Sequence, residues 1–381
     1  MKTVGYTVLM LFLIGFGCNE KIIPPPPMEE TPRWNVVPEL ASLDVRYMIQ
    51  RNGVLYLAAI DPAIRSTEVI NDTTYYRGDR GVIYKTTDGI TWTKIKGFKN
   101  DIGAMTFHGD TLYCLAYYYI WRLLPNGVWQ TAFKTPPRLV DVSADGDMIF
   151  INDSLYAMQT VFGNAMETYR ISPDGSYAEV PGPDGLYHYA GAKFIKTVRN
   201  GKETVYLRPP WYGWGFFQFD GYSYKHLENG LTEDELRSSP TNSMAIKDDT
   251  LFAGFGGYIS PGAIKILIGN QWTQFRDTIP YSHSAYLISP ILRTEPTAII
   301  FVGERMFIAT NSQGVMEWKG NEGWVRMSEG LKPGYIPDLQ EPDLRHPLPF
   351  LEYFQGNLIA AYGKPGYGPW GEVGVYTCGL K

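Results

Sequence analysis

The chain is poor in the features that mark several large classes of protein. Only 19% of its 381 residues are charged, and its 34 basic residues do not outnumber its 39 acidic ones, so nucleic acid is not an expected partner. It has no glycine-rich phosphate loop, no HExxH, no EF-hand loop and no GxSxG. We therefore predict no metal site, no cofactor and no serine nucleophile.

Cysteine is also scarce, with three residues in the whole chain. So few thiols exclude a disulfide framework. Neither Cys114 nor Cys378 has the CxxC spacing that is typical of metal and redox sites. We predict that both are free, because the repeats described below place them on modules that should not be neighbours.

The apolar run at the N-terminus is too short for a membrane-spanning helix, which needs roughly 20 residues. It follows Lys2, covers Val8 to Phe16, and is typical of an export signal. Gly17 and Cys18 end it, and a small residue directly before a cysteine at this place resembles the bacterial lipobox, although Gly15 stands where that family usually has leucine. The resemblance implies cleavage before Cys18 and a lipid on its thiol. An ordinary signal peptide with an incidental cysteine is the alternative.

A proline-rich segment comes next. Residues 18–33 contain four successive prolines, Pro24 to Pro27, and no apolar periodicity, which predicts an extended spacer. Acyl chains attach a protein to a membrane without crossing it. We expect a signal peptide over 1–17, a lipidated tether over 18–33 and one folded domain over 34–381. The expected location is the bacterial cell envelope, at the periplasmic side or the cell surface of the outer membrane, with the lipid as the sole membrane contact.

The rest of the chain is rich in residues typical of strands and turns, with 40 Gly, 27 Pro and 27 Tyr. A tight polar turn followed by an aliphatic–aromatic pair recurs about every 50 residues, a spacing that suits four short strands with their loops. Its seven instances are Asn52–Tyr56, Gly109–Tyr113, Asn152–Tyr156, Lys202–Tyr206, Asp248–Phe252, Gly303–Phe307 and Gly356–Ile359.

A second turn, leading into an aromatic residue, follows in six of the seven units. Its instances are Asp88–Trp92, Asn126–Trp129, Asp174–Tyr177, Asp220–Tyr222, Gly269–Trp272 and Asn321–Trp324. The last unit lacks it and ends after a third strand at Val373 to Tyr376, while Trp34 to Leu40, ahead of the first unit, resembles Trp324 to Leu331.

This displacement predicts that the N-terminal strand completes the last unit. The predicted fold is all-β: a seven-bladed β-propeller of four-stranded antiparallel blades, closed by hydrogen bonds between the two chain ends, which leaves no open edge. An open solenoid or sandwich array is the competing interpretation, and it gives no reason for the displaced marker.

Several segments resemble known propeller repeats. Two segments resemble the repeats of two-component regulator propellers: Gly314 to Gly320 running into Trp324 and Glu329–Leu331, and Gly215 to Gly221 running into Glu228–Leu231. Thr86 to Trp92 resembles the Asp-box repeat of bacterial neuraminidases, shortened by one residue. In those families the motifs fix turns between sheets, so the resemblance implies a fold and no chemistry. A sensor function would need a separate partner, because the chain shows no kinase, receiver or DNA-binding segment.

If the strands of a blade are called A to D from the centre outwards, the B-to-C and D-to-A connections share one face. Nearly every long connection falls on this loop-bearing face, where binding sites usually lie on a rigid scaffold. Aromatic rings with polar edges suit sugar rings or peptide side chains, although single rings can instead pack between loops. The predicted ligand-binding residues are Tyr75, Tyr76, Arg77, Tyr118, Arg208, Trp211, Tyr212, Trp214, Tyr258, Tyr367 and Trp370.

We predict from this a non-catalytic protein that binds a glycan or an envelope protein. The alternative is a propeller polysaccharide lyase or glycosidase that acts on an acidic glycan, with His188, His283 and His346 as its candidate acids and bases beside Tyr and Arg in the same cleft. A structural partner in an envelope complex is a third possibility. The one predicted helix, Thr232 to Ser238, with Thr232 as its N-cap, decorates a loop.

Overall fold

Short polar turns divide the chain into antiparallel hairpins in the computed structural model of the protein. In a two-residue hairpin turn of type I′ both central residues need a left-handed backbone, which Asn, Asp and Gly accept most readily. Asn52 and Gly53 have φ of 49° and 71°, and Asp248 and Asp249 have φ of 48° and 58°. The structure describes residues 32–64, 67–70, 73–76, 80–116, 119–135, 147–160, 166–181, 193–199, 202–208, 216–237, 243–256, 262–276, 278–279, 296–310, 313–332, 335–336, 341–342, 348–363 and 373–380.

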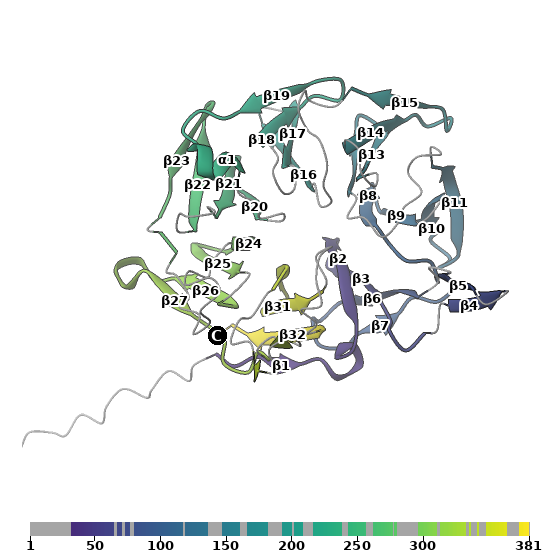
Figure 1. Cartoon of the computed structure of the whole chain (residues 1–381), viewed down its shortest axis with the longest axis horizontal. Coiled ribbons are helices and arrows are strands. Elements are labelled where there is room, and N and C mark those ends of the chain that lie inside the picture. The colour runs from purple at the N-terminus through teal and green to yellow at the C-terminus, as the bar shows by residue number, and fades with distance from the viewer. Residues whose placement is uncertain are drawn as a thin grey trace, which may run out of the picture. The chain divides into compact units, whose positions relative to one another are not determined.

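The hairpins form seven four-stranded antiparallel sheets arranged around a ring, so the predicted β-propeller is confirmed (Figure 1). From the innermost strand outwards, the first three blades are β2 (Asp44–Arg51), β3 (Val54–Ile60), β6 (Gly81–Thr86) and β7 (Thr93–Lys94); β8 (Ala104–His108), β9 (Thr111–Ala116), β10 (Tyr119–Leu123) and β11 (Trp129–Lys134); and β12 (Asp147–Ile151), β13 (Ser154–Thr160), β14 (Met166–Ile171) and β15 (Tyr177–Val180).

The remaining blades follow the same order. They are β16 (Lys193–Arg199), β17 (Lys202–Arg208), β18 (Phe216–Phe219) and β19 (Tyr224–Leu227); β20 (Met244–Lys247), β21 (Thr250–Phe255), β22 (Ala263–Ile268) and β23 (Gln271–Gln274); β24 (Pro296–Val302), β25 (Arg305–Thr310), β26 (Val315–Trp318) and β27 (Trp324–Arg326); and β30 (Phe350–Phe354), β31 (Asn357–Tyr362), β32 (Gly374–Gly379) and β1 (Asn35–Val36).

One predicted turn was misplaced. Lys202 and Glu203 lie in β17, where Lys202 pairs with Arg199 and Glu203 pairs with Val198. The hairpin of the fourth blade is therefore two residues longer than the repeat suggested, and residues 200 and 201, which connect its two strands, lie outside the described residues.

The ring closes as the sequence predicted. β1 pairs antiparallel with β32, with Asn35 opposite Thr377 and Val36 opposite Tyr376, and the two strands lie side by side in Figure 1. The N-terminal segment thus supplies the outermost strand of the seventh blade. Each of the seven blades therefore has four strands among the described residues.

A tryptophan contact joins the closing strand to the sixth blade. Trp34, 2% exposed, donates from Nε1 to the carbonyl oxygen of Met327 at 2.6 Å, and its backbone N–H donates to the carbonyl oxygen of Glu329 at 2.9 Å. Trp272 makes the same pair of bonds to the fourth blade, to the carbonyl oxygens of Leu227 and Asn229, both at 2.8 Å. The closing joint therefore repeats a joint found inside the ring.

The glycine after each of these contacts is required by the close approach of the tryptophan backbone. Gly230 and Gly330 have φ of 86° and 89°, in the left-handed region. A Cβ on Gly330 would overlap the carbonyl oxygen of Trp34, and one on Gly230 would overlap that of Trp272. The segments quoted above for the regulator-propeller resemblance thus act as sockets between blades.

The hydrophobic core lies between blades. Each junction around the ring has its own cluster of buried side chains drawn from two neighbouring sheets, and the junction of the seventh and first blades, with Leu40, Leu57 and Ile359, is packed like the others. Cys114 and Cys378 are buried in two different clusters and are both free, as predicted.

The aspartates of two C-to-D turns accept hydrogen bonds from backbone N–H groups of the same turn. Asp88 accepts hydrogen bonds from the N–H groups of Ile90 and Thr91, at 2.8 and 2.7 Å, and from the hydroxyl of Thr86 at 2.9 Å. These bonds keep the pKa of Asp88 well below its usual range. Asp220 accepts N–H bonds from Tyr222 and Ser223 in the same way.

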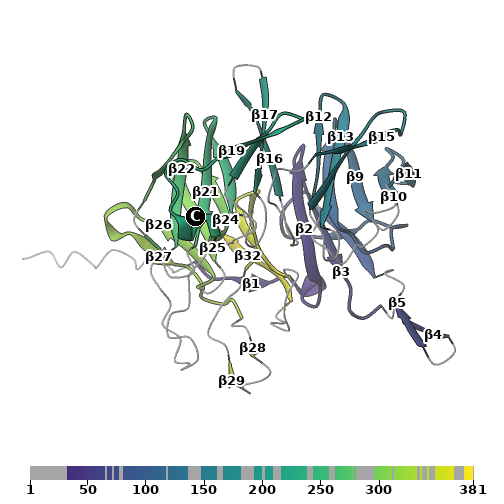
Figure 2. The same ribbon diagram turned by 45° about the horizontal axis from the view of Figure 1, so that its top comes forward.

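The alternation of strands places the strand ends that begin and finish the B-to-C and D-to-A connections on one face, as expected. Two of these connections, treated as loops from the sequence, each contain a hairpin: β4 (Thr67–Ile70) with β5 (Thr73–Tyr76), and β28 (Tyr335–Ile336) with β29 (Glu341–Pro342). Figure 2 shows both hairpins projecting to the same side of the ring.

Helices are short in the described parts of the chain: α1 (Glu233–Arg237) and the 3₁₀ turns η1 (Pro38–Leu40) and η2 (Gly320–Glu322). The predicted cap is confirmed, because Thr232 Oγ1 accepts from the N–H of Glu235 at 3.2 Å while the Glu235 carboxylate accepts from the N–H of Thr232 at 2.8 Å. None of the described helices has the length and apolar character needed to span a membrane.

We expect Gly330→Ala to destabilise the fold by about 2–4 kcal/mol, because the new methyl group must displace the Trp34 backbone as well as adopt a left-handed conformation. Gly320→Ala is the matched control: Gly320 also has a positive φ, 63°, but a Cβ there meets nothing within 4 Å. It should cost only about 1 kcal/mol. Denaturant unfolding measures both, and equal losses would contradict the socket.

Candidate functional site

The innermost strands line the channel at the centre of the ring. Each of them starts at the loop-bearing face, where a D-to-A connection ends, and runs to a tight A-to-B turn. Lys193 is the first residue of β16, Asp147 the first of β12 and Phe350 the first of β30. Polar side chains at these positions therefore lie in the half of the channel nearest the long connections.

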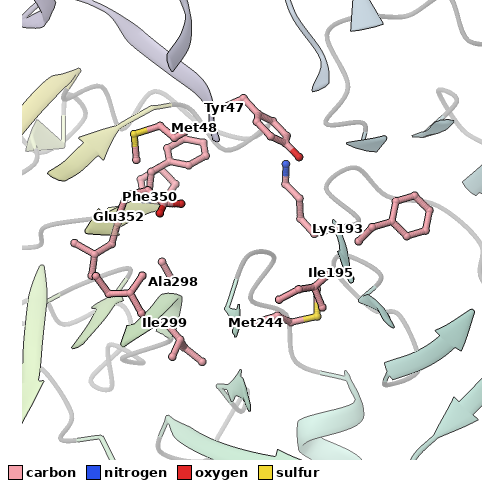
Figure 3. Close-up of a pocket in the computed structure, with 13 residues that line it drawn as sticks. Tyr47, Met48, Lys193, Ile195, Met244, Ala298, Ile299, Phe350 and Glu352 are labelled. Atoms are coloured by element: carbon pink, nitrogen blue, oxygen red, sulfur yellow. The ribbon is translucent and has the colours of Figure 1, made fainter. Parts of the chain in front are cut away.

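A cavity of about 180 Å³ lies between these innermost strands. We call it the central cavity; the innermost strands of the first, fourth, fifth, sixth and seventh blades line it. Apolar side chains form much of its wall, with Met48, Ile195, Met244, Ile299 and Phe350 among the lining residues (Figure 3). Its polar groups come from three side chains, Tyr47, Lys193 and Glu352.

Tyr47 is held by a buried carboxylate. Its hydroxyl donates to Asp147 Oδ1 at 2.5 Å, and Asp147 also accepts from the N–H groups of Phe194, at 2.6 Å, and Met148, at 2.9 Å. Asp147 is only 1% exposed, and burial raises its pKa against the opposing effects of Lys193 and these bonds. Burial also raises the pKa of Tyr47 well above its usual value, and the neighbouring Asp147 adds to the effect. Asp147 therefore ties the first, third and fourth blades together across the channel.

Lys193 lies against the ring of Tyr47, with Nζ 3.9 Å from the ring centroid, a cation–π contact. Figure 3 shows the ammonium group and the Tyr47 hydroxyl close together on one side of the cavity. Within the described parts of the chain, no hydrogen bond or ion pair engages Nζ of Lys193. Its three N–H donors are therefore available to a molecule in the central cavity.

Glu352 lies on the side of the cavity formed by Phe350 (Figure 3). Burial raises the pKa of its carboxyl to about 7. No described residue donates a hydrogen bond to it, in contrast to Asp147, which has three donors. Glu352 is thus a carboxyl that changes charge near neutral pH and faces an open space rather than a protein partner.

Together these groups offer a cation, a hydroxyl and a titratable carboxyl around an apolar wall. Such a set can bind the polar ends of a small molecule or move a proton. Across the described residues there is no group of three or more His, Cys, Asp or Glu side chains placed to hold a metal ion.

Comparison with known proteins supports the architecture. No family model matches the chain, and no curated protein matches it significantly in sequence. Solved structures do match. Virginiamycin B lyase from Staphylococcus aureus aligns with 92% of this chain and 99% of its own length, at 12% identity and a TM-score of 0.56. The WD40 propeller domain of Doa1 aligns with 91% of this chain and 97% of its own length, at 9% identity and a TM-score of 0.50.

A third match is the extracellular domain of a protein described as a one-component system from B. thetaiotaomicron. It aligns with 91% of this chain at 10% identity and a TM-score of 0.54, and this chain spans only 40% of its length. Likeness at such identities shows the fold alone. The chain is a seven-bladed β-propeller.

The structure locates only part of the propeller site predicted from the sequence. Tyr75 and Tyr76 lie in β5, and Arg208 is the last residue of β17, directly opposite Lys193 in the pairing of β16 and β17. The side chains of these three are not described. Outside the described residues lie Arg77, Tyr118, Trp211, Tyr212, Trp214, Tyr258, Tyr367 and Trp370, the alternative catalytic residues His188, His283 and His346, and Cys18.

The sequence analysis missed Tyr47, Asp147, Lys193 and Glu352, although a signal for Glu352 is present. Counting back three residues from the first residue of each A-to-B turn gives Ile49, Thr106, Ile149, Thr197, Ala245, Ile300 and Glu352. Glu352 is the one charged residue at this repeat position. A charge on an innermost strand of a propeller faces the channel or its neighbouring sheets, so this departure from the repeat indicates a functional position.

We expect Glu352→Gln to stabilise the protein at alkaline pH and to have little effect at acid pH. With its pKa raised from 4.5 to about 7 in the folded state, Glu352 ionises first in the unfolded chain, so its contribution to stability falls as pH rises through that window. The variant should match wild type at pH 4 and exceed it by about 1–3 kcal/mol at pH 8. Thermal unfolding across pH measures this, with Glu179→Gln on exposed β15 as control.

Proposed function

We propose that the protein is a lipid-anchored binding protein of the bacterial cell envelope. It holds a glycan or another envelope protein on its loop-bearing face and does not transform it. The loop that follows Arg208, with Trp211, Tyr212 and Trp214, supplies the principal contacts.

The pairing of Arg208 with Lys193 is the observation that carries this proposal. Because the two residues are directly opposite each other, the aromatic loop leaves the sheet at the strand that brings Lys193 to the central cavity. The loop thus starts beside the channel mouth rather than at the outer edge of the ring. A rigid sheet with an aromatic loop at such a mouth is the usual setting for a binding site on this kind of scaffold.

The proposed location rests on the N-terminal segment. A short apolar run, Gly17-Cys18 and a proline-rich spacer form the ordered set of features expected of a lipoprotein. One of the structurally similar proteins is itself an extracellular domain of a bacterial protein, which is compatible with this location.

Replacing Trp211 and Trp214 together by Ala should abolish binding on a glycan array, because stacked aromatic rings contribute much of the affinity in sites of this kind. The matched control is Tyr222→Ala. Tyr222 belongs to the same blade, is 70% exposed and lies on the opposite face, in the turn between β18 and β19. An array on which both variants bind like wild type would reject the loop as the site.

A lyase acting on acidic glycans is the second candidate, and the cavity chemistry favours retaining it. A carboxyl with a pKa near 7 and a lysine line one cavity, which is a possible acid–base pair. If array-positive glycans incubated with the protein gained the ultraviolet absorbance of unsaturated uronates, and Glu352→Gln, His188→Ala or His283→Ala removed that gain, the enzyme would replace the binding protein as the proposal.

The anchor is tested separately from the ligand. Full-length protein expressed in a bacterial host should partition into the detergent phase of a Triton X-114 extract, since an attached acyl chain makes it amphiphilic. Cys18→Ser should move it to the aqueous phase. If both proteins stayed in the aqueous phase, Cys18 would be the incidental residue of an ordinary signal peptide.

A further inference from the structure

The central cavity has two charged groups that make no hydrogen bond within the described parts of the protein. Lys193 has its cation–π contact with Tyr47 and lies near the charge of Asp147, but its N–H groups have no acceptor, and the carboxyl of Glu352 has no donor. Asp147, by contrast, has three hydrogen bonds. Polar groups that lack hydrogen bonds in a partly buried site are unfavourable for folding, and they gain when a ligand supplies the missing bonds.

The surroundings of Glu352 restrict what that ligand can be. β24 contributes only Ala298, Ile299 and Ile300 to the cavity, and β20 contributes Met244. The other titratable side chains that line the cavity are Lys193 and Tyr47, and Tyr47 already donates to Asp147. No positive group among the described residues forms an ion pair with Glu352. A ligand that satisfies it must therefore bring its own hydrogen-bond donor or positive charge.

The volume shows how much of a ligand the cavity can enclose. Liquid water occupies about 30 Å³ per molecule, and an enclosed apolar cavity of about 150 Å³ accepts benzene, with six carbon atoms. The central cavity, about 180 Å³ and partly open, therefore has room for a small molecule of about that size. The side chains of Met48, Ile195, Met244 and Ile299 favour a branched aliphatic body, because they offer no hydrogen bonds to the hydroxyl groups of a sugar ring.

We propose that the central cavity binds a free amino acid with an aliphatic side chain. Lys193 holds the ligand's carboxylate, Glu352 holds its ammonium group, and the side chain packs against the apolar wall. This site is distinct from the aromatic loop and goes beyond the proposed function, since its ligand is neither a glycan nor a protein.

The proposal predicts that affinity for the amino acid depends on pH. Glu352 is partly protonated at neutral pH, and it must be ionised to pair with an ammonium group. Binding should therefore release a proton, and affinity should rise about tenfold between pH 6 and pH 8. A ligand that merely filled the cavity would show no such dependence.

Isothermal titration calorimetry of the intact protein with L-leucine and L-valine tests the site. At least one should bind, and two leucine analogues should bind at least about tenfold more weakly: 4-methylpentanoate, which lacks the ammonium group, and 3-methylbutylamine, which lacks the carboxylate. Glu352→Gln and Lys193→Met should each weaken amino-acid binding about ten- to hundredfold, and Glu352→Gln should remove the pH dependence.

Glu179→Gln and Lys225→Met, exposed substitutions on β15 and β19, are the matched controls and should bind like wild type. Thermal unfolding checks that each variant is folded. If one variant does not fold, the pH dependence of amino-acid binding by the wild-type protein still tests the proposal. The proposal is overturned if neither amino acid binds, or if binding survives either cavity substitution in a folded variant. The glycan array uses a different ligand, so a negative result with amino acids leaves the proposed function to be decided there.

Discussion

The pairing of the two chain ends is the constraint on which the rest of the structure depends. β1 completes the seventh blade, and Trp34 enters the socket formed by Met327 to Gly330. Closure fixes the seventh blade beside the first, and that neighbourhood places Glu352 in the same cavity as Tyr47. An open array of the same blades would keep every local turn and lose this cavity. The site is thus a product of ring closure rather than of any one repeat.

Two acidic side chains near the channel illustrate how environment assigns roles. Asp147 and Glu352 both lie on innermost strands, and burial raises the pKa of both. Asp147 has three donors from three blades, so it serves as a brace. Glu352 has none among the described residues and faces open space, so its charge remains available for a ligand. The difference lies in hydrogen bonding, not in residue type.

Much of this architecture could be predicted because the tight turns between strands need particular residue types, which recur along the sequence. The positive φ of residues such as Asn52 and Gly53 requires particular residue types, so the repeat count and the closing strand were visible in the sequence. The fourth turn was misplaced because Lys202 and Glu203 imitate a polar turn while pairing as strand. The cavity was missed because its residues come from five blades and share no common spacing in the sequence. Only Glu352 could have been found, because it is a charged residue at a repeat position that is uncharged in the other six blades.

The division between strands and loops also explains where specificity can arise. Tyr47, Lys193 and Glu352 belong to paired strands, so their positions are fixed before any ligand arrives and little entropy is lost on binding. Two of the long connections on the same side carry an extra hairpin, while their neighbouring blades keep four strands. Lys193 and Arg208 are opposite residues of one hairpin. The strand residues that line the cavity and the aromatic loop after Arg208 therefore meet at the pairing of β16 and β17. A ring of this kind can therefore keep its inner chemistry constant while its outer loops change partner.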